Sequence, residues 1–269
     1  MQVDDPLLFG AIIAVVAILL VTRQLLRWRR ARDLDARAAA DGWQPIGGED
    51  ADRLADLVRT AFPELGQEAA GDAHRGGVRP RGGAGSTIRL GRSSTKVGGR
   101  ARNVHVLPVD GGTAVVGDVK VTAARGAAGQ DRAAVHRGAV GAQLATSLPQ
   151  MTLTARDWID HGEVVDLPAA MRERFSAARL SDDARRLYLD AGAYEPLTAA
   201  PDELQGVAVT GDTLVLLSAS ELTPEAAEAL AATADRFAAR ALEAADAAPA
   251  GAGSAPTTPS RLRSPIATG

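Results

Sequence analysis

Four side chains between positions 157 and 163 have the chemical types needed for metal binding or acid–base catalysis. They are Asp157, Asp160, His161 and Glu163. Carboxylates and imidazole bind divalent metals and transfer protons near neutral pH. Their spacing matches no established ligand motif, and polar residues after a strand also suit a turn or a helix cap. We therefore expect no catalytic, metal or cofactor residues, and keep a membrane-anchored enzyme using this cluster as an alternative.

Two other kinds of site are excluded by composition and spacing. A phosphate-binding P-loop needs four residues between its glycines, followed by lysine. Here Gly85 and Gly91 enclose five residues, and Arg92 stands where the lysine is required. The chain contains no cysteine, which excludes disulfides, thiol catalysis and zinc–thiolate sites.

The segment 73–102 is glycine-rich and strongly basic, with eight Arg or Lys residues and no acidic residue. Arg-Gly-Gly steps at 75–77 and 81–83 resemble units of RNA-binding arrays, and a basic segment near a membrane also attracts anionic lipid. A solvated loop with one edge strand, 87–90, is the interpretation that we favour, because charge runs are usually solvated. The candidate anion contacts are Arg75, Arg79, Arg81, Arg89 and Arg92.

The longest apolar run lies near the N-terminus. Residues 6–22 are seventeen consecutive uncharged residues, which as a helix cover roughly 26 Å. A bilayer core about 30 Å thick takes about 17–25 residues, and Leu25 and Leu26 can lengthen the span. The pattern predicts a transmembrane helix at 6–26. A buried core helix is disfavoured because the run is apolar on all sides.

Charges that flank this run predict its orientation. Asp4 and Asp5 precede it, whereas arginines dominate after it. Arginine-rich flanks stay in the cytoplasm, so we expect the N-terminus outside and the body inside the cell. A cleaved signal peptide is disfavoured because the segment before the run is acidic rather than basic. The predicted membrane-interface residues are Arg23, Arg27, Trp28, Arg29 and Arg30.

The remaining chain predicts an α+β body with an antiparallel sheet flanked by helices. Valine-rich alternation around Asp110-Gly111-Gly112 is typical of a hairpin, and Ser181 and Thr223 are typical helix caps. The predicted helices are 52–62, 182–190 and 224–242, with a short turn at 194–199. The predicted strands are 103–109, 113–122 and 148–155, with a second hairpin formed by 207–209 and 213–217.

These features divide the chain into successive regions. A short extracytoplasmic N-terminus, 1–5, precedes the transmembrane helix, 6–26, and a basic juxtamembrane segment, 27–48. The cytoplasmic body follows at 49–245. The tail, 246–269, is rich in Ala, Gly, Pro, Ser and Thr, a composition typical of disorder.

Residues 171–242 resemble part of a group of actinobacterial single-pass membrane-anchored proteins of uncharacterised function. The matching features are Gly42-Trp43, Phe175, the run 181–187, the strand 213–216 and the helix after Thr223. The segment 64–102 departs from the group's pattern, being more basic and richer in glycine. The resemblance implies a membrane anchor and an α+β body, and it implies no enzymatic activity.

Together these observations predict a membrane-tethered interaction or scaffold module at the inner face of the cell membrane. The expected partners are the lipid bilayer and other membrane or cytoplasmic proteins. Nucleic acid or anionic lipid bound through 73–102 is the alternative, and its binding would weaken steeply with salt.

Overall fold

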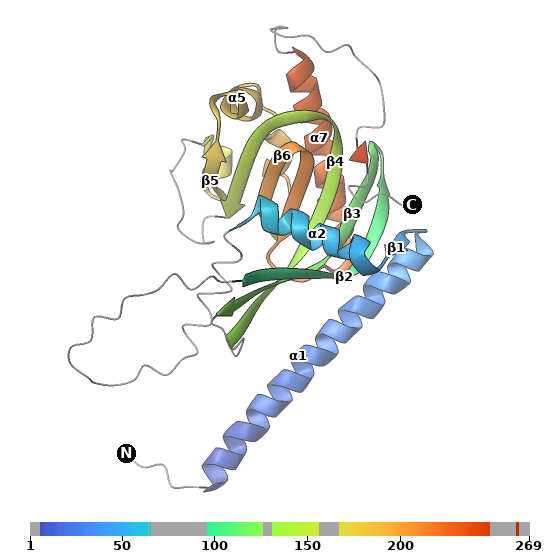
Figure 1. Ribbon diagram of the computed structural model, residues 1–269, viewed down its shortest axis with the longest axis vertical. Helices are drawn as coiled ribbons and strands as arrows, with labels where there is room; N and C mark the ends of the chain where they lie inside the picture. Colours follow the sequence, from blue (N-terminus) through green and yellow to red (C-terminus); the bar gives the residue numbers. More distant parts are fainter. Residues whose placement is uncertain are drawn as a thin grey trace, which may run out of the picture.

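The protein is an α+β chain in which helices flank one mainly antiparallel sheet, as the sequence predicts (Figure 1). The computed structural model describes residues 6–63, 65, 96–125, 131–155, 167–247 and 262–263. The helices are α1 (Pro6–Ala40), α2 (Gly48–Ala61), α4 (Ala169–Arg172), α5 (Asp182–Ala184), the π-helix η1 (Arg185–Asp190), α6 (Glu195–Thr198) and α7 (Pro224–Ala247). The strands are β1 (Gln44–Ile46), β2 (Lys96–Val109), β3 (Gly112–Arg125), β4 (Asp131–Ala155), β5 (Phe175–Leu180), β6 (Leu204–Ser218) and β7 (Leu262–Arg263).

Strand β4 organises the sheet. Its first part pairs with β3, its last part pairs with β5, and β6 pairs with it in both parts. On the far side of β3, the strands β2 and β1 complete the sheet. The predicted strand at 148–155 is therefore only the end of β4, which begins at Asp131, and β5 was not predicted.

The first predicted hairpin is confirmed, and the second is wrong. Strands β2 and β3 pair from Val109↔Gly112 outward, as the turn residues predict. The two runs expected to form the second hairpin instead belong to one strand, β6, and both pair with β4. Gly211 has φ +64°, and β4 has extra residues between Gln143 and Leu148. The turn signal at Gly211 therefore marks a bend in a strand, opposite a bulge in its neighbour.

Both faces of the sheet are covered. One face packs against α2, where Leu54 and Val58 contact valines of β2 and β3. The other packs against α7, where Leu230 and Phe237 join residues of β4 and β6. Helix α2 covers the predicted helix at 52–62 except for Phe62, which is its C-cap, and it begins four residues earlier, at Gly48. Two apolar layers thus fix the strands from both sides.

The helix-capping signals are confirmed. The Ser181 hydroxyl accepts a hydrogen bond from the Ala184 amide at 3.2 Å. The Thr223 hydroxyl accepts one from the Ala226 amide at 3.2 Å, and Pro224 is the first residue of α7. The predicted helix at 182–190 is helical throughout, although its second part is the π-helix η1.

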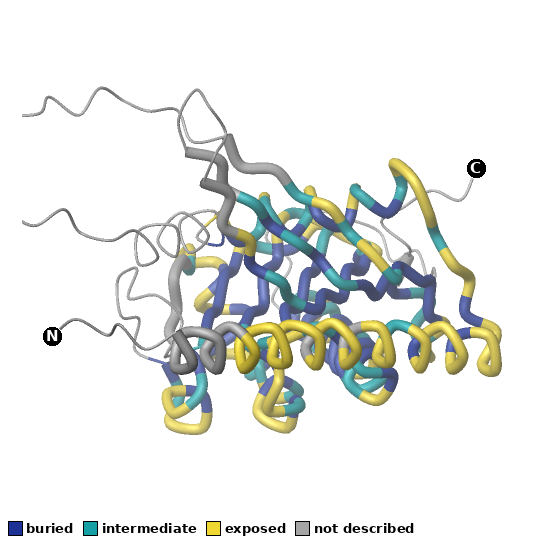
Figure 2. Tube along the Cα trace, turned by 90° about the horizontal axis from the view of Figure 1, so that it is seen from below, coloured by how far each residue is buried: buried dark blue, intermediate teal, exposed yellow. Residues whose placement is uncertain are grey.

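Helix α1 is one continuous helix of 35 residues. It extends well past the sheet, and its C-terminal end reaches β1 (Figure 1). Its described side chains from Ala14 to Arg30 are exposed, and Figure 2 shows the exposed colour along most of it. Among the side chains that the structure describes, which exclude residues 6–13, no helix combines the length and apolarity of a membrane span.

The chain returns to the sheet near its end. Leu262 and Arg263 form β7 between the start of β3 and the middle of β4. The sequence predicted disorder throughout 246–269, so these two residues depart from the expectation. Helix α7 also continues to Ala247. The rest of the predicted tail, 248–261 and 264–269, lies outside the described residues.

Candidate functional site

Many of the sequence-predicted site residues lie outside the described part of the chain. This holds for the polar cluster 157–163 and for the candidate anion contacts Arg75, Arg79, Arg81, Arg89 and Arg92. Arg23 and Arg27 lie on α1, but their side chains are not described. Trp28, Arg29 and Arg30 are exposed on α1, and the Arg32 guanidinium stacks over the Trp28 ring, 4.8 Å from its centroid.

The end of α1 docks on the body through a narrow apolar stripe. Leu34 and Ala38 are buried, with 0% and 2% of their surface exposed, and they belong to the same apolar core as Trp43. Positions 34 and 38 share one helix face because they are four positions apart. Helix α1 ends before Gly42, whose φ of +71° suits glycine. Its last two turns are therefore part of the core, whereas the preceding turns are not.

Polar contacts hold the same junction. Arg37 Nε lies 2.9 Å from Glu228 Oε1 on α7, and Arg37 also pairs with Asp41. His105 Nε2 on β2 lies 3.2 Å from Asp35 Oδ1. The hydrogen bond to Glu228, together with the charge of Asp41, raises the pKa of Arg37. These contacts join α1 to both α7 and the sheet.

A groove of about 460 Å³ opens beside this junction. Its apolar lining includes Trp43, Leu107 and Val109. Its walls come from the β2–β3 turn and from one face of α7. The charged lining residues are Asp41, Asp110, Glu228, Asp235 and Arg236. The lining thus has four carboxylates and one guanidinium, with a second guanidinium, that of Arg37, nearby. The groove therefore has an acidic rim around an apolar floor.

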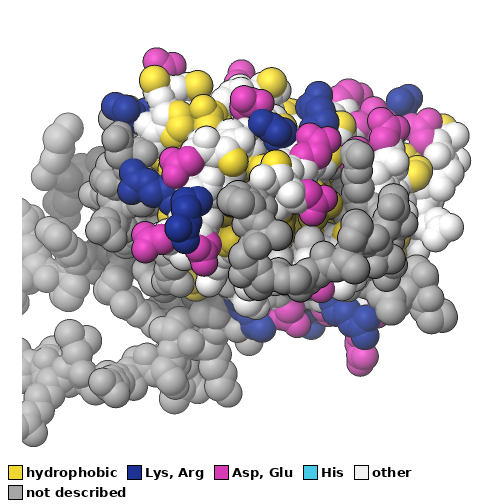
Figure 3. Space-filling model, turned by 90° about the horizontal axis from the view of Figure 1, so that it is seen from above, with side chains coloured by type: hydrophobic (Ala, Val, Ile, Leu, Met, Phe, Trp, Pro, Cys, Tyr) yellow, Lys and Arg dark blue, Asp and Glu magenta, His cyan; other side chains and the backbone are white. Residues whose placement is uncertain are grey.

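The acidic rim differs from another part of the surface in how its charges are arranged. On the face seen from above in Figure 3, basic and acidic side chains are interspersed. Interspersed charges largely cancel at distances beyond a Debye length, about 8–10 Å. The groove combines apolar surface with an excess of one charge, which is the chemistry expected of a site for a cationic, partly apolar ligand.

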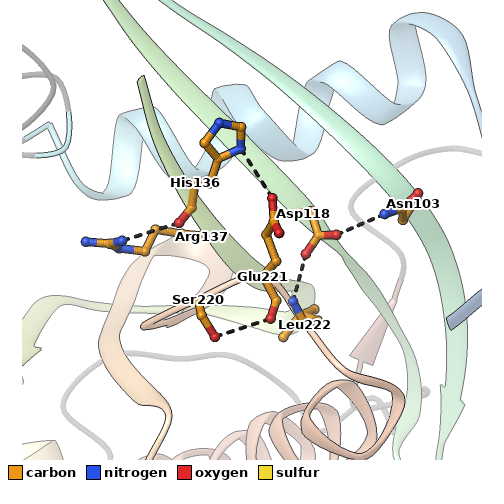
Figure 4. A network of polar contacts seen from close by, with 7 residues as sticks. All are labelled: Asn103, Asp118, His136, Arg137, Ser220, Glu221 and Leu222. Atoms are coloured by element: carbon orange, nitrogen blue, oxygen red, sulfur yellow. Dashed lines mark hydrogen bonds and ion pairs between the residues drawn. The ribbon is translucent and has the colours of Figure 1, made fainter. Parts of the chain in front are cut away.

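A second polar cluster joins the sheet to the loop before α7 (Figure 4). Asp118 on β3 accepts a hydrogen bond from the Asn103 amide group at 3.0 Å and one from the Leu222 backbone amide at 2.8 Å. His136 Nδ1 lies 3.5 Å from Glu221 Oε1. Asn103 has φ +51°, a left-handed conformation that asparagine tolerates better than most residues.

Burial raises the pKa of Asp118 to about 6, and its two hydrogen bonds oppose that rise. A carboxyl group with a pKa near 6 could transfer protons at neutral pH. However, the groove and a small hollow beside α2 are lined by other residues. The contacts of Asp118 instead connect three segments, so we assign it a structural role.

Little in the sequence indicates that these residues come together. The junction and groove gather Asp35, His105 and Glu228 from α1, β2 and α7, and Trp43 from the segment between α1 and β1. His105 in particular stands alone in the sequence, without a motif. Within the described residues, no group of three or more His, Asp or Glu side chains is arranged to hold a metal ion.

Comparisons with known proteins add little. No family model and no curated protein matches the chain. Among solved structures, the chain is similar to the crystal structure of the mycobacterial trehalose monomycolate transport factor A, TtfA. The identity is 13% and the TM-score 0.41, over 80% of this chain and 94% of that one. This similarity is too slight to define the fold or function of the chain.

Proposed function

We propose that this chain is a single-pass membrane protein whose cytoplasmic body serves as an interaction module. In this proposal, residues 6–26 lie in the bilayer and the rest of α1 is a stalk that continues into the body. The acidic groove beside the stalk binds a protein partner. No catalytic step is part of the proposal.

One contrast along α1 carries the membrane part of the proposal. Val15, Ile18, Leu19 and Leu20 are each between 56% and 64% exposed, yet Leu34 on the same helix is fully buried. Among the described residues, the exposed large hydrophobic side chains all lie on α1, between Val15 and Trp28. A continuous exposed apolar surface marks an interaction site, and an uncharged run of seventeen residues suits lipid.

The orientation rests on charge. Asp4 and Asp5 precede the uncharged run, whereas Arg29, Arg30 and Arg32 follow it. Arginine-rich flanks are retained in the cytoplasm. The side chains of Arg29 and Arg30 are exposed rather than docked on the body, so they are available to anionic headgroups, each worth about 1 kcal/mol.

The docked stalk makes the groove a suitable place for a partner. Because α1 is anchored in the body through Leu34 and Ala38, the groove is held at a fixed position relative to the stalk. Its apolar floor and acidic rim favour a segment with basic and apolar side chains. A protein partner with a basic amphipathic segment satisfies both requirements.

The proposal is tested by photo-cross-linking in native membranes. A benzoylphenylalanine at Ala232, an exposed residue in the groove, should give a discrete protein adduct. The same probe at Ala199, which is exposed outside the groove, is the matched control and should not. The Asp110→Arg change should weaken the adduct through charge repulsion, whereas Asp190→Arg should leave it unchanged.

Two results would contradict the proposal. Identical adducts from Ala232 and Ala199 would mean that the groove is not the contact surface. Removal of the chain from membranes by alkaline carbonate would mean that residues 6–26 do not span the bilayer. The two failures are distinguishable, because the first leaves the membrane anchor intact.

A further inference from the structure

Strands β3 and β4 separate at one end, and a third segment enters between them. Their regular pairing runs from Arg125↔Asp131 to Val115↔Gly141 and stops there. Continuing the register would place Gly112 opposite Leu144. Instead, Leu262 pairs with both Gly112 and Leu144. The sheet therefore opens at this end, and β7 occupies the opening.

At the opening, β4 is no longer paired with β3. On its other side β4 pairs with β6 at Gln143↔Thr213 and next at Leu148↔Gly211. The residues 144–147 therefore lie in a bulge that β6 does not follow. Leu144 in this stretch is buried, with 3% of its surface exposed. Buried backbone amides and carbonyls need hydrogen-bond partners, which an added strand supplies. At Leu144, that partner is Leu262.

Glycine permits the approach of a strand from the other side. Gly112 has φ +145°, a value that residues with a side chain rarely adopt. A glycine within a strand often marks the place where another backbone approaches closely. Gly112 begins β3 and is also the residue of β3 that pairs with β7.

The length of the chain makes its own tail the natural occupant. Helix α7 ends at Ala247 and β7 begins at Leu262, so the fourteen residues 248–261 connect them. A tether of about that length keeps the attached segment at a local concentration on the order of millimolar. The docked segment is only two residues long, so its attachment depends on this tethering and remains exchangeable.

We propose that the opening between β3 and β4 is a strand-addition site for an extended peptide, occupied reversibly by the chain's own C-terminal segment around Leu262 and Arg263. Recognition is through the backbone of Gly112, Gln143 and Leu144. The site is distinct from the groove lined by Trp43 and Glu228, and it does not depend on the proposed membrane function.

Hydrogen–deuterium exchange of the full chain in detergent micelles tests this site. Leu262→Pro removes an amide donor and restricts the backbone. We expect exchange at 112–114 and 142–144 to accelerate by about tenfold or more. Thr257→Pro, between existing prolines at 256 and 259, is the control and should leave exchange unchanged. The interior of β3, around Val119, should be unaffected in both variants.

A peptide added in trans tests exchangeability. A synthetic peptide of residues 258–267, added at a millimolar concentration that matches the tethered segment, should restore protection at 112–114 and 142–144 in the Leu262→Pro chain. The same peptide carrying Leu262→Pro should not. Unchanged exchange in the Leu262→Pro chain would overturn the assignment of the site. Failure of the native peptide to restore protection would overturn the reversible docking of β7. A dimer that is lost in the Leu262→Pro chain would mean that the tail of a second copy is the occupant.

Discussion

His105 on β2 and Asp35 on α1 lie in contact, with Nε2 of His105 3.2 Å from Oδ1 of Asp35. His105 is 4% exposed and forms a T-shaped contact with the Trp43 ring, with the ring centroids 6.2 Å apart. Burial lowers the pKa of His105, and the charge of Asp35 opposes this effect. The junction between stalk and sheet therefore contains a histidine that is neutral in the folded state at neutral pH.

The junction should weaken in acid. Because its pKa is lower in the folded chain than in the unfolded one, His105 contributes stability that is lost as the pH falls below 6.5. Trp43 fluorescence, measured in a Trp28→Phe, Trp158→Phe background, should shift to the red as the pH falls. The His105→Gln variant should show a flatter profile. Equal profiles would remove His105 as the titrating group.

Asp118 should give the opposite dependence on pH. It holds its proton more tightly in the folded chain, so the free energy of unfolding should fall as the pH rises from 3.8 to about 6, and then level off. The change should amount to at most about 3 kcal/mol. Urea unfolding in micelles at pH 4 and pH 7 measures it. Asp118→Asn should reduce this slope, and an unchanged slope would contradict the assignment.

Gly138 should not tolerate a side chain. A Cβ atom there would lie 2.4 Å from Leu222 Cγ, and the Gly138 amide donates to the Ser220 carbonyl at 2.6 Å. We expect Gly138→Ala to destabilise the chain by about 1–3 kcal/mol. Gly47→Ala is the matched control, because a Cβ there meets nothing within 4 Å. Thermal unfolding of both variants compares them, and similar melting temperatures would contradict the tight packing at Gly138.

Leu34 should secure the stalk to the body. Leu34→Ala removes a fully buried side chain and should cost about 2–5 kcal/mol. The loss should appear as faster hydrogen exchange across residues 31–40. Leu25→Ala, at a position 54% exposed on the same helix, should change exchange there little. If both variants behave alike, the docking of α1 does not depend on the apolar stripe.

Signals carried by a few neighbouring residues correctly predicted one hairpin and two helix starts, because these features do not depend on distant contacts. Asp110-Gly111-Gly112 predicted the β2–β3 hairpin, and Ser181 and Thr223 predicted two helix starts. Gly211 produced an error because the same residue suits a turn and a bend within a strand. Only the pairing register of β6 with β4 distinguishes a hairpin turn from a bend within a strand. That register depends on residues far apart in the sequence.

The groove and the junction could not be predicted for the same reason. In the sequence, Trp43 stands out only within the Gly42-Trp43 pair of the family resemblance, and His105 carries no signal by itself. Their roles arise when α1, β2 and α7 meet. The membrane anchor, in contrast, stays a prediction, and it rests on a continuous run of residue types that needs no tertiary contact to be recognised.

The most direct test of the account uses the absence of native cysteine. Single-cysteine chains are labelled in intact cells and in open native membranes with a membrane-impermeant maleimide. Gln2→Cys should label from outside, Ala199→Cys only after the membranes are opened, and Leu19→Cys in neither case because lipid covers it. Leu19 is 63% exposed in the isolated chain. Labelling of Leu19→Cys as fast as that of Ala199→Cys in open membranes would contradict a bilayer-embedded α1.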